Sequence, residues 1–206
     1  MDEVPFDSVR ARCSAFASLL GMSGSGVSVY GQPLDASSDT VLALEEWQYV
    51  LGDGPSIRAL TTDSITGIAD THDSGSSEWT EFRGHLDDAS IGSVFAFPMH
   101  LSSRCVGVLT FYGARSGALT DERLSDGAMS AGLAAISLQG ASGKGPASAL
   151  DFRRFDRMHR AAGVIMFELG VDADEALERI RAYAQVRRRP LRDVVADILL
   201  GDVQLV

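Results

Sequence analysis

The sequence predicts an α+β protein in which an antiparallel sheet with flanking helices is followed by an all-α three-helix bundle. Residues 1–139 mix helical periodicity with runs of β-branched and aromatic residues, whereas residues 150–206 show helical periodicity throughout. Residues 140–149 are rich in Gly, Ser and Ala and lack apolar periodicity, which is typical of a linker. We therefore expect a sheet domain at 1–139, a linker at 140–149 and a helical domain at 150–206.

The first domain is expected to begin and end with helices. The first helix has apolar residues at helical spacing from Val9 to Leu20 and stops at Gly21, and the last one follows a capping residue, Thr120. Shorter helices are predicted at 45–51, near Ser56 and around Trp79 and Phe82. Strands are predicted at 26–30, 40–44, 65–69, 93–101 and 105–112. The last two strands form a hairpin, and we expect the helices on one face of the sheet.

The second domain contains three expected helices. The first runs over 151–169 and is ended by Gly170, the second is capped by Asp172 in a capping box with Glu175, and the third has Pro190 in its first turn. Short helices joined by tight turns predict a minimal bundle.

Charge is divided unevenly along the chain. The net charge is −10, yet residues 1–150 hold 8 basic and 18 acidic side chains, while residues 151–206 hold 10 of each. Because nucleic-acid binding needs a positive surface, we expect such a surface only in the second domain. No apolar stretch approaches the roughly 20 residues of a membrane span, and the acidic N-terminus is unlike a signal peptide. We expect a cytoplasmic protein with no membrane partner.

The sequence offers little catalytic chemistry. It has two cysteines, Cys13 and Cys105, which we interpret as buried apolar residues, and its four histidines lack metal-ligand spacing. A P-loop, a dinucleotide fingerprint and a nucleophile elbow are absent from the sequence. We therefore expect no enzymatic activity, no cofactor and no metal.

The first domain carries the run WQYVLGDGPS at 47–56, then Trp79 and Phe82, and hairpin segments at 93–99 and 106–109. With these features the region 42–138 resembles a GAF domain, although Trp79 is followed by Thr80 where the family usually has proline. The resemblance implies a domain that either binds a small molecule between sheet and helices or serves as a dimerisation module. Both alternatives stay open, and the sequence names no ligand.

The second domain carries RAAGVIM at 160–166, then EAL at 175–177, and LRDVVA at 191–196. In these segments it is similar to the ANTAR domain, a three-helix RNA-binding antitermination module of bacterial regulators. The resemblance implies binding to a pair of hairpin loops in leader RNA, which keeps an overlapping terminator from folding. Many relatives have Lys or another polar residue at the position of Ala162, so one RNA contact of the family is missing here.

The candidate RNA-binding surface combines arginines with the small residues of the first helix. Arginines in the first helix lie opposite its apolar stripe, and a second group gathers where the second helix ends; both suit bidentate phosphate contacts. The alternative for the first group is an exposed polar face whose arginines pair with nearby Asp151 and Asp156, and the alternative for the second group is a solvated helix end. Gly163 indicates close approach of RNA or of another helix. The candidate residues are Arg153, Arg157, Arg160, Ala161, Gly163, Arg181, Arg187, Arg188 and Arg189.

Two hypotheses for function follow. The first is an RNA-binding antitermination regulator, expected to form a homodimer through the helices at 9–20 and 124–138, whose apolar residues step by three and four. The second is a small-molecule sensor or protein-interaction dimer that does not bind RNA and uses the helical tail for assembly.

Overall fold

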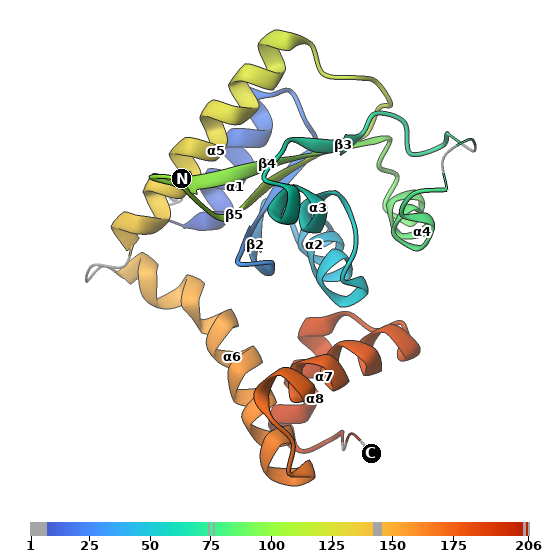
Figure 1. The fold of residues 1–206 in the computed structure, drawn as a ribbon, viewed down its shortest axis with the longest axis vertical. Helices are drawn as coiled ribbons and strands as arrows, with labels where there is room; N and C mark the ends of the chain where they lie inside the picture. Colours follow the sequence, from blue (N-terminus) through green and yellow to red (C-terminus); the bar gives the residue numbers. More distant parts are fainter. Residues whose placement is uncertain (1–7, 74, 76, 142–145, 204, 206) are drawn as a thin grey trace, which may run out of the picture.

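A sheet domain and a helical bundle stack along the long axis of the molecule (Figure 1). The computed structural model describes residues 8–73, 75, 77–141, 146–203 and 205, excluding the side chains of 139–156. In chain order the elements are α1 (Val9–Leu19), β1 (Gly24–Val29), β2 (Gln32–Ala36), α2 (Asp39–Leu51), α3 (Pro55–Thr62), β3 (Thr66–Ile68), α4 (Thr80–Asp88), β4 (Ser93–Leu101), β5 (Arg104–Gly113), α5 (Asp121–Ala141), α6 (Pro146–Leu169), α7 (Ala173–Arg187) and α8 (Leu191–Leu200).

The described strands form one antiparallel sheet in the order β2-β1-β5-β4-β3. Its centre is the β4–β5 hairpin that the sequence predicted. Pro98 pairs with Val108 on one side, while β3 pairs only with residues 94–96 of β4 on the other. Pro98 therefore lies where β4 has become an edge, which is where a residue without an N–H group is tolerated.

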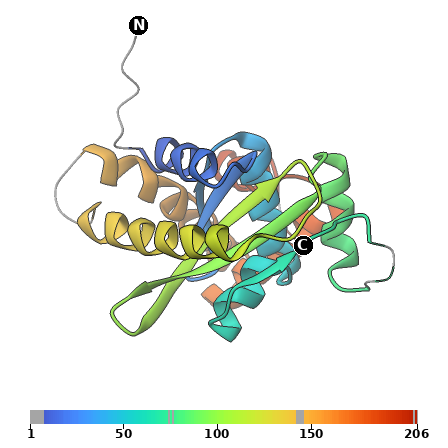
Figure 2. The same cartoon turned by 90° about the horizontal axis from the view of Figure 1, so that it is seen from above.

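Helices cover both faces of the sheet, and the expectation of helices on one face is wrong (Figure 2). Alternate residues of β4 and β5 point to opposite sides. Phe97 and Phe111 pack with α1 and α5, whereas Val94 and Tyr112 pack with α2 and α4. Strands β4 and β5 therefore carry apolar side chains on both faces, and their sequences are nearly continuous stretches of buried residues.

The structure corrects two assignments in the first domain. Residues 40–44, expected as a strand, belong to α2, which begins after Ser38; the Ser38 hydroxyl accepts a hydrogen bond from the backbone N–H of Val41 at 3.2 Å. Strand β2 was missed because Pro33 and Asp35 are poor strand formers. It forms the edge beside β1, and an edge tolerates proline.

The junction between the domains is more helical than expected. Helix α5 extends to Ala141 and α6 begins at Pro146, so the predicted linker is helical at both ends, with residues 142–145 outside the described part. The Asp172 cap is confirmed, because its carboxylate accepts from the N–H of Glu175 at 2.9 Å. The Glu175 carboxylate bonds to Arg179 instead of closing a capping box. Pro190 precedes α8 as its N-cap.

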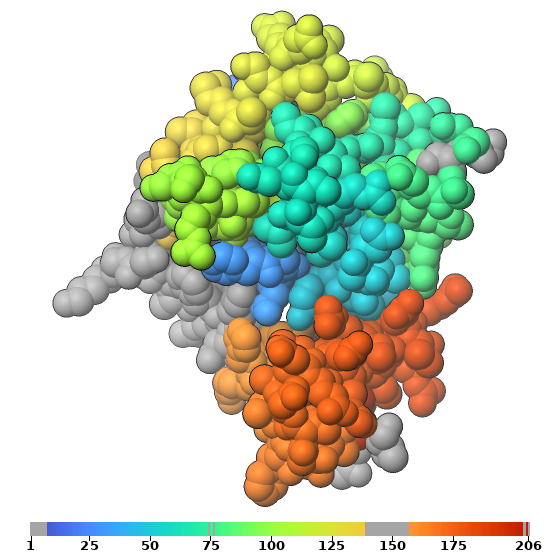
Figure 3. Space-filling view, in the orientation of Figure 1, coloured from blue at the N-terminus to red at the C-terminus, as the bar shows by residue number. Residues whose placement is uncertain are grey.

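The bundle does not close its core alone. Tyr49 and Val50 of α2 pack into the same apolar cluster as Ile165, Ile180 and Ile198 of the three C-terminal helices. The space-filling view shows the bundle lying directly against the sheet domain below α2 (Figure 3). Helix α2 thus contacts the sheet with one side and the bundle with another. Within the described residues, no helix is long and apolar enough to span a membrane.

Candidate nucleic-acid interface

Helix α6 divides into a buried and an outward side. Ala161 and Ile165 are fully buried in the bundle core, and at 100° per residue the positions of Arg160, Gly163 and Phe167 lie together on the other side. Arg160 is exposed, and Phe167 is 91% exposed. We call these three positions the α6 stripe. It combines a cation, a gap and an aromatic ring on two successive turns.

Gly163 provides open space on this side. A Cβ atom built at Gly163 would have no described neighbour within 4 Å outside the local helix backbone. Packing within the described chain therefore does not require glycine, although glycine inside a helix costs about 1 kcal/mol relative to alanine. Gly163 therefore leaves the helix surface between Arg160 and Phe167 without a side chain.

The turn between α7 and α8 presents Arg187 and Arg188. Arg188 ends α7 with a left-handed backbone (φ 49°), and its N–H bonds to the carbonyl of Gln185. Both arginines are exposed, and the Arg187 guanidinium lies 5.6 Å from the ring centre of Tyr183. The local turn therefore directs these two charges to solvent.

Three further arginines of this region have partners in the protein. Arg189 forms an ion pair with Asp197 at 2.7 Å, and the pKa of Arg189 is raised by that hydrogen bond. The Arg181 guanidinium lies 5.2 Å from the ring centre of Tyr49 on α2. Arg192 lies 3.9 Å from the Glu46 carboxylate and donates to the carbonyl of Asp39. Arg181 and Arg192 thus hold the bundle against the sheet domain.

The candidate RNA-binding residues predicted from the sequence differ in their exposure to solvent. Arg157, Arg160, Gly163, Arg187 and Arg188 are exposed. Ala161 is fully buried, so its side chain is not part of the surface, and the Arg153 side chain is outside the described residues.

Sequence reasoning missed Phe167. Its signal was available, because Phe167 lies seven residues after Arg160 and therefore falls on the polar side of a helix whose apolar stripe lies opposite.

The interior of the sheet domain holds a polar network where α2 and α3 cover the sheet. The Tyr112 hydroxyl donates to Glu45 at 2.7 Å, and the Gln48 amide donates to Tyr112 at 3.0 Å. The Gln48 carbonyl oxygen accepts from the N–H of Ser56. Burial raises the pKa of Glu45 from 4.5 to about 7, against the opposing effect of the Tyr112 hydrogen bond. Side chains of this network fill space between sheet and helices.

A separate cavity lies between the domains. Its volume is about 140 Å³, and both domains line it: Gln32, Pro33, Leu42, Glu46 and Tyr49 from the sheet domain, and Arg157, Met158, Leu191, Arg192 and Val195 from the bundle. Apolar side chains form most of the wall, with arginines from α6 and α8 at its margin. A small molecule there would touch both domains.

Residues 152–199 match the family model of the ANTAR domain. Curated proteins show no match.

Two solved structures resemble the sheet domain. A domain of a putative two-component sensor histidine kinase from Sinorhizobium meliloti 1021 has 15% identity and a TM-score of 0.50, over 67% of this chain and 92% of that one. The GAF domain of a two-component sensor histidine kinase from Bacillus halodurans has 11% identity and a TM-score of 0.47, over 66% and 96%.

The expected ANTAR domain is confirmed over residues 152–199, and the expected antiparallel sheet with flanking helices is confirmed in the N-terminal part. The family match characterises the C-terminal part of the chain. The structural likeness concerns the fold of the N-terminal part. The chain thus combines an N-terminal antiparallel sheet flanked by helices with a C-terminal helical part that matches the ANTAR family model.

Proposed function

We propose that this chain is an RNA-binding transcription antitermination regulator. Its ANTAR domain binds hairpin-loop leader RNA and so prevents an overlapping terminator from forming, while the GAF-like domain supplies sensory or dimerisation input. The observation that carries the proposal is the α6 stripe, because it places Arg160, Gly163 and Phe167 on one exposed surface inside the region that matches the ANTAR family.

The stripe suits unpaired bases. Sequence-specific RNA recognition targets loops, whose bases stack on aromatic rings or guanidinium planes, since the A-form major groove is too narrow for side chains. A Phe ring left 91% exposed is unfavourable in the free protein, whereas a base laid on it removes apolar surface from water. Helical side chains lean toward the N-terminus, so the gap at Gly163 leaves room beside the Phe167 ring.

Two arginines of α6 support RNA binding at the α6 stripe. Arg157 and Arg160 are exposed and form no ion pair with another residue of the described part. Guanidinium groups bind phosphate oxygens in a bidentate way, and each phosphate neutralised releases counterions. The RNA backbone would therefore contact the arginines while loop bases contact Phe167.

A homodimer is part of the proposal. The apolar residues at 9–20 and 124–138 that step by three and four, among them Cys13, Ala131 and Ala135, are buried against the sheet, so the expectation that they form the dimer contact is wrong. Other apolar residues of these helices are exposed, namely Met129, Leu133 and Ile136 at helical spacing on α5 and Leu19 on α1. Such an apolar row is typical of a helix that packs on a second copy. A dimer would present two ANTAR domains to the two hairpins of a leader RNA. Light scattering should give a dimer mass, and a monomer mass at micromolar concentration would contradict this part.

Two regions in or beside the sheet domain bear on where an input ligand could bind. The polar network around Glu45 occupies space between sheet and helices, while the cavity between the domains touches α2, α6 and α8. A small molecule in that cavity would alter how Arg181 and Arg192 are held, and this is a physical route from input to RNA surface.

The proposal is tested with the full chain and RNA selected from a library of two-hairpin transcripts with randomised loops. We expect enrichment of particular loop sequences, affinity that falls steeply with salt, and read-through of a terminator placed to overlap the second hairpin. Selected RNA with its loops replaced is the matched control. Binding that is absent at low salt would exclude RNA regulation and favour a small-molecule sensor or protein-interaction dimer.

A further inference from the structure

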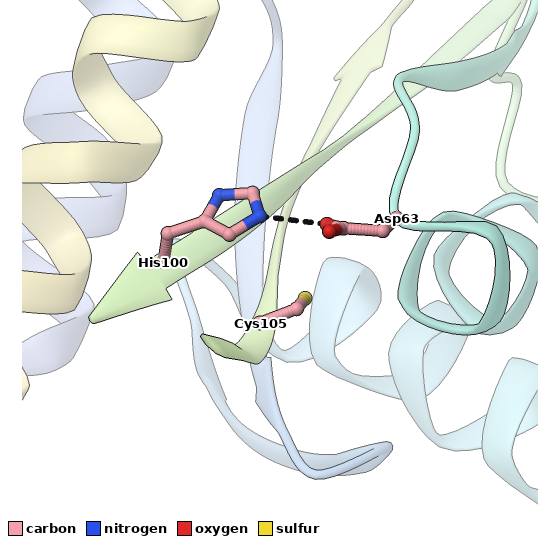
Figure 4. Close-up of side chains that lie close together, drawn as sticks. All are labelled: Asp63, His100 and Cys105. Atoms are coloured by element: carbon pink, nitrogen blue, oxygen red, sulfur yellow. Dashed lines mark hydrogen bonds and ion pairs between the residues drawn. The ribbon is translucent and has the colours of Figure 1, made fainter. Parts of the chain in front are cut away.

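Three side chains of different chemistry meet at one end of the sheet domain (Figure 4). Asp63 ends α3, His100 lies near the end of β4, and Cys105 lies at the start of β5. Their candidate ligand atoms all lie within 4.8 Å of one another, and His100 Nε2 is 2.6 Å from Asp63 Oδ1.

We propose that Asp63, His100 and Cys105 bind a divalent transition-metal ion of the zinc type. Zinc is bound by thiolate sulfur, imidazole nitrogen and carboxylate oxygen, usually in four-coordinate geometry. Three protein ligands would leave one position for water or another ligand. Calcium and magnesium prefer oxygen ligands, so a thiol and an imidazole in one cluster select against them.

The fold supplies this geometry from segments far apart in sequence. His100 and Cys105 are paired across the β4–β5 hairpin, and the register shift between Met99 and His100 lies beside them. Asp63 has a left-handed backbone (φ 51°), a conformation that Asp tolerates better than most residues. Asp63 and His100 are exposed, and Cys105 is half-buried, so the expectation that Cys105 is a buried apolar residue is wrong. An ion from solvent can therefore reach all three.

Without metal, the cluster is held by modest interactions. His100 bonds to Asp63, and the Cys105 thiol donates a long bond to the Gly107 carbonyl at 3.4 Å. Burial raises the pKa of the Cys105 thiol, which is therefore protonated at neutral pH. Metal binding would replace the thiol proton, which passes to solvent, and no electron is transferred. The ion would link the end of α3 to the hairpin.

A second His–Asp pair in the molecule provides a control. His72 Nδ1 lies 3.3 Å from Asp87 on α4, and this pair belongs to no ligand cluster among the described residues. The second cysteine, Cys13, is buried in the core between α1 and the sheet. If the proposal is correct, these two residues do not contribute to metal binding.

The test uses the full chain, reduced and freed of metal with a chelator, and then titrated with Co²⁺ or with Zn²⁺ against a chromophoric chelator. We expect one equivalent per chain, proton release, and a cobalt–thiolate charge-transfer band. Asp63→Asn, His100→Gln and Cys105→Ser should each weaken binding by about tenfold or more, and Cys105→Ser should abolish the band.

Cys13→Ser and His72→Gln should bind metal like the parent chain. Circular dichroism establishes whether each variant is folded. If Cys105→Ser does not fold, His100→Gln tests the site instead, because His100 is exposed and its substitution should not disturb the fold. The proposal would be overturned if the parent chain bound no metal. It would also be overturned if the folded variants His100→Gln and Cys105→Ser bound metal with the same affinity as the parent chain. RNA binding is measured separately, so failure of the metal site leaves the proposed function untouched.

Discussion

An acidic residue of the sheet domain and three arginines of the bundle differ sharply in their exposure to solvent. In the sheet domain, Glu45 is fully enclosed between α2 and the sheet, and its carboxyl is bonded to Tyr112. In the bundle, Arg160, Arg187 and Arg188 are exposed. A buried acid acts through desolvation and changes the free energy of unfolding with pH, whereas an exposed guanidinium hardly changes stability and is free to bind an anion.

This contrast separates stability from binding. Substitutions at Glu45 should change stability and leave RNA affinity unchanged in the folded protein. Substitutions of the exposed arginines should do the reverse. The arginines that hold the domains together, Arg181 and Arg192, are intermediate, because they contact Tyr49 and Glu46 of the sheet domain.

The largest effect is expected from Glu45. Its pKa is raised from 4.5 to about 7 on folding, so the folded state binds more protons than the unfolded state between these values. Stability from this group is therefore present below pH about 4.5 and is lost as pH rises to about 7, by about 3 kcal/mol. Urea denaturation at about pH 4 and about pH 8, on the two sides of this window, measures the difference.

Glu45→Gln removes the titration while retaining an amide oxygen that accepts from Tyr112. We expect the variant to lose this part of the pH dependence, and Glu78→Gln, at an exposed position, to keep it. If the pH dependence were unchanged in Glu45→Gln, the Glu45 carboxyl would titrate alike in the folded and unfolded states. The contrast between a buried acid that affects stability and exposed arginines that do not would then be wrong.

The next effect concerns the exposed arginines of α6. Replacing both Arg157 and Arg160 with Ala should weaken RNA binding by roughly 2–3 kcal/mol, because charge-assisted contacts to phosphates are lost. The log–log salt dependence should flatten by roughly one to two units. Filter binding over a salt series measures both. Stability should stay within about 0.5 kcal/mol, and a larger loss would mean that these arginines support the fold.

Phe167→Ala should reduce RNA affinity by about 1–3 kcal/mol, as loss of one base–aromatic stack does, without changing the salt dependence. Phe167→Trp retains a stacking surface and should bind like the parent. Leu200→Ala, at another exposed apolar position of the bundle, is the matched control. Equal affinity of Phe167→Ala and the parent would assign the ring to a protein contact instead.

The smallest effect is expected at the turn after α7. Replacing Arg187 and Arg188 with Ala should weaken RNA binding by about 1 kcal/mol, because these flexible side chains at an exposed turn lose entropy on binding. The salt dependence should again flatten by roughly one unit. Arg189→Ala is a matched control, since that guanidinium already pairs with Asp197 and should not contribute. An effect larger than that of the α6 pair would move the main phosphate contacts to this turn.

Local patterns predicted most of the elements. Helical spacing identified α1 and α5, and the β4–β5 hairpin followed from two apolar runs around a short turn. The pattern misassigned residues 40–44, because a short apolar run fits a buried strand and a buried helix equally well. Strand β2 escaped detection because its pairing with β1, and not its composition, makes it a strand.

For the candidate surface, sequence alone identified which residue types lie on which side of α6, because helical periodicity is a local property that needs no tertiary partner. It did not determine which arginines are available. Arg181 contacts the ring of Tyr49 on α2, and Arg189 forms an ion pair with Asp197 on α8. Neither partner lies on α7, the helix that carries Arg181 and ends just before Arg189.

The cluster of Asp63, His100 and Cys105 was likewise beyond sequence reasoning, since no spacing rule connects a helix end to a hairpin. Periodicity along the chain determined most of the helices and the faces they present, because it is a local property. Packing between remote segments decided that Arg181 contacts Tyr49 and that Asp63, His100 and Cys105 meet.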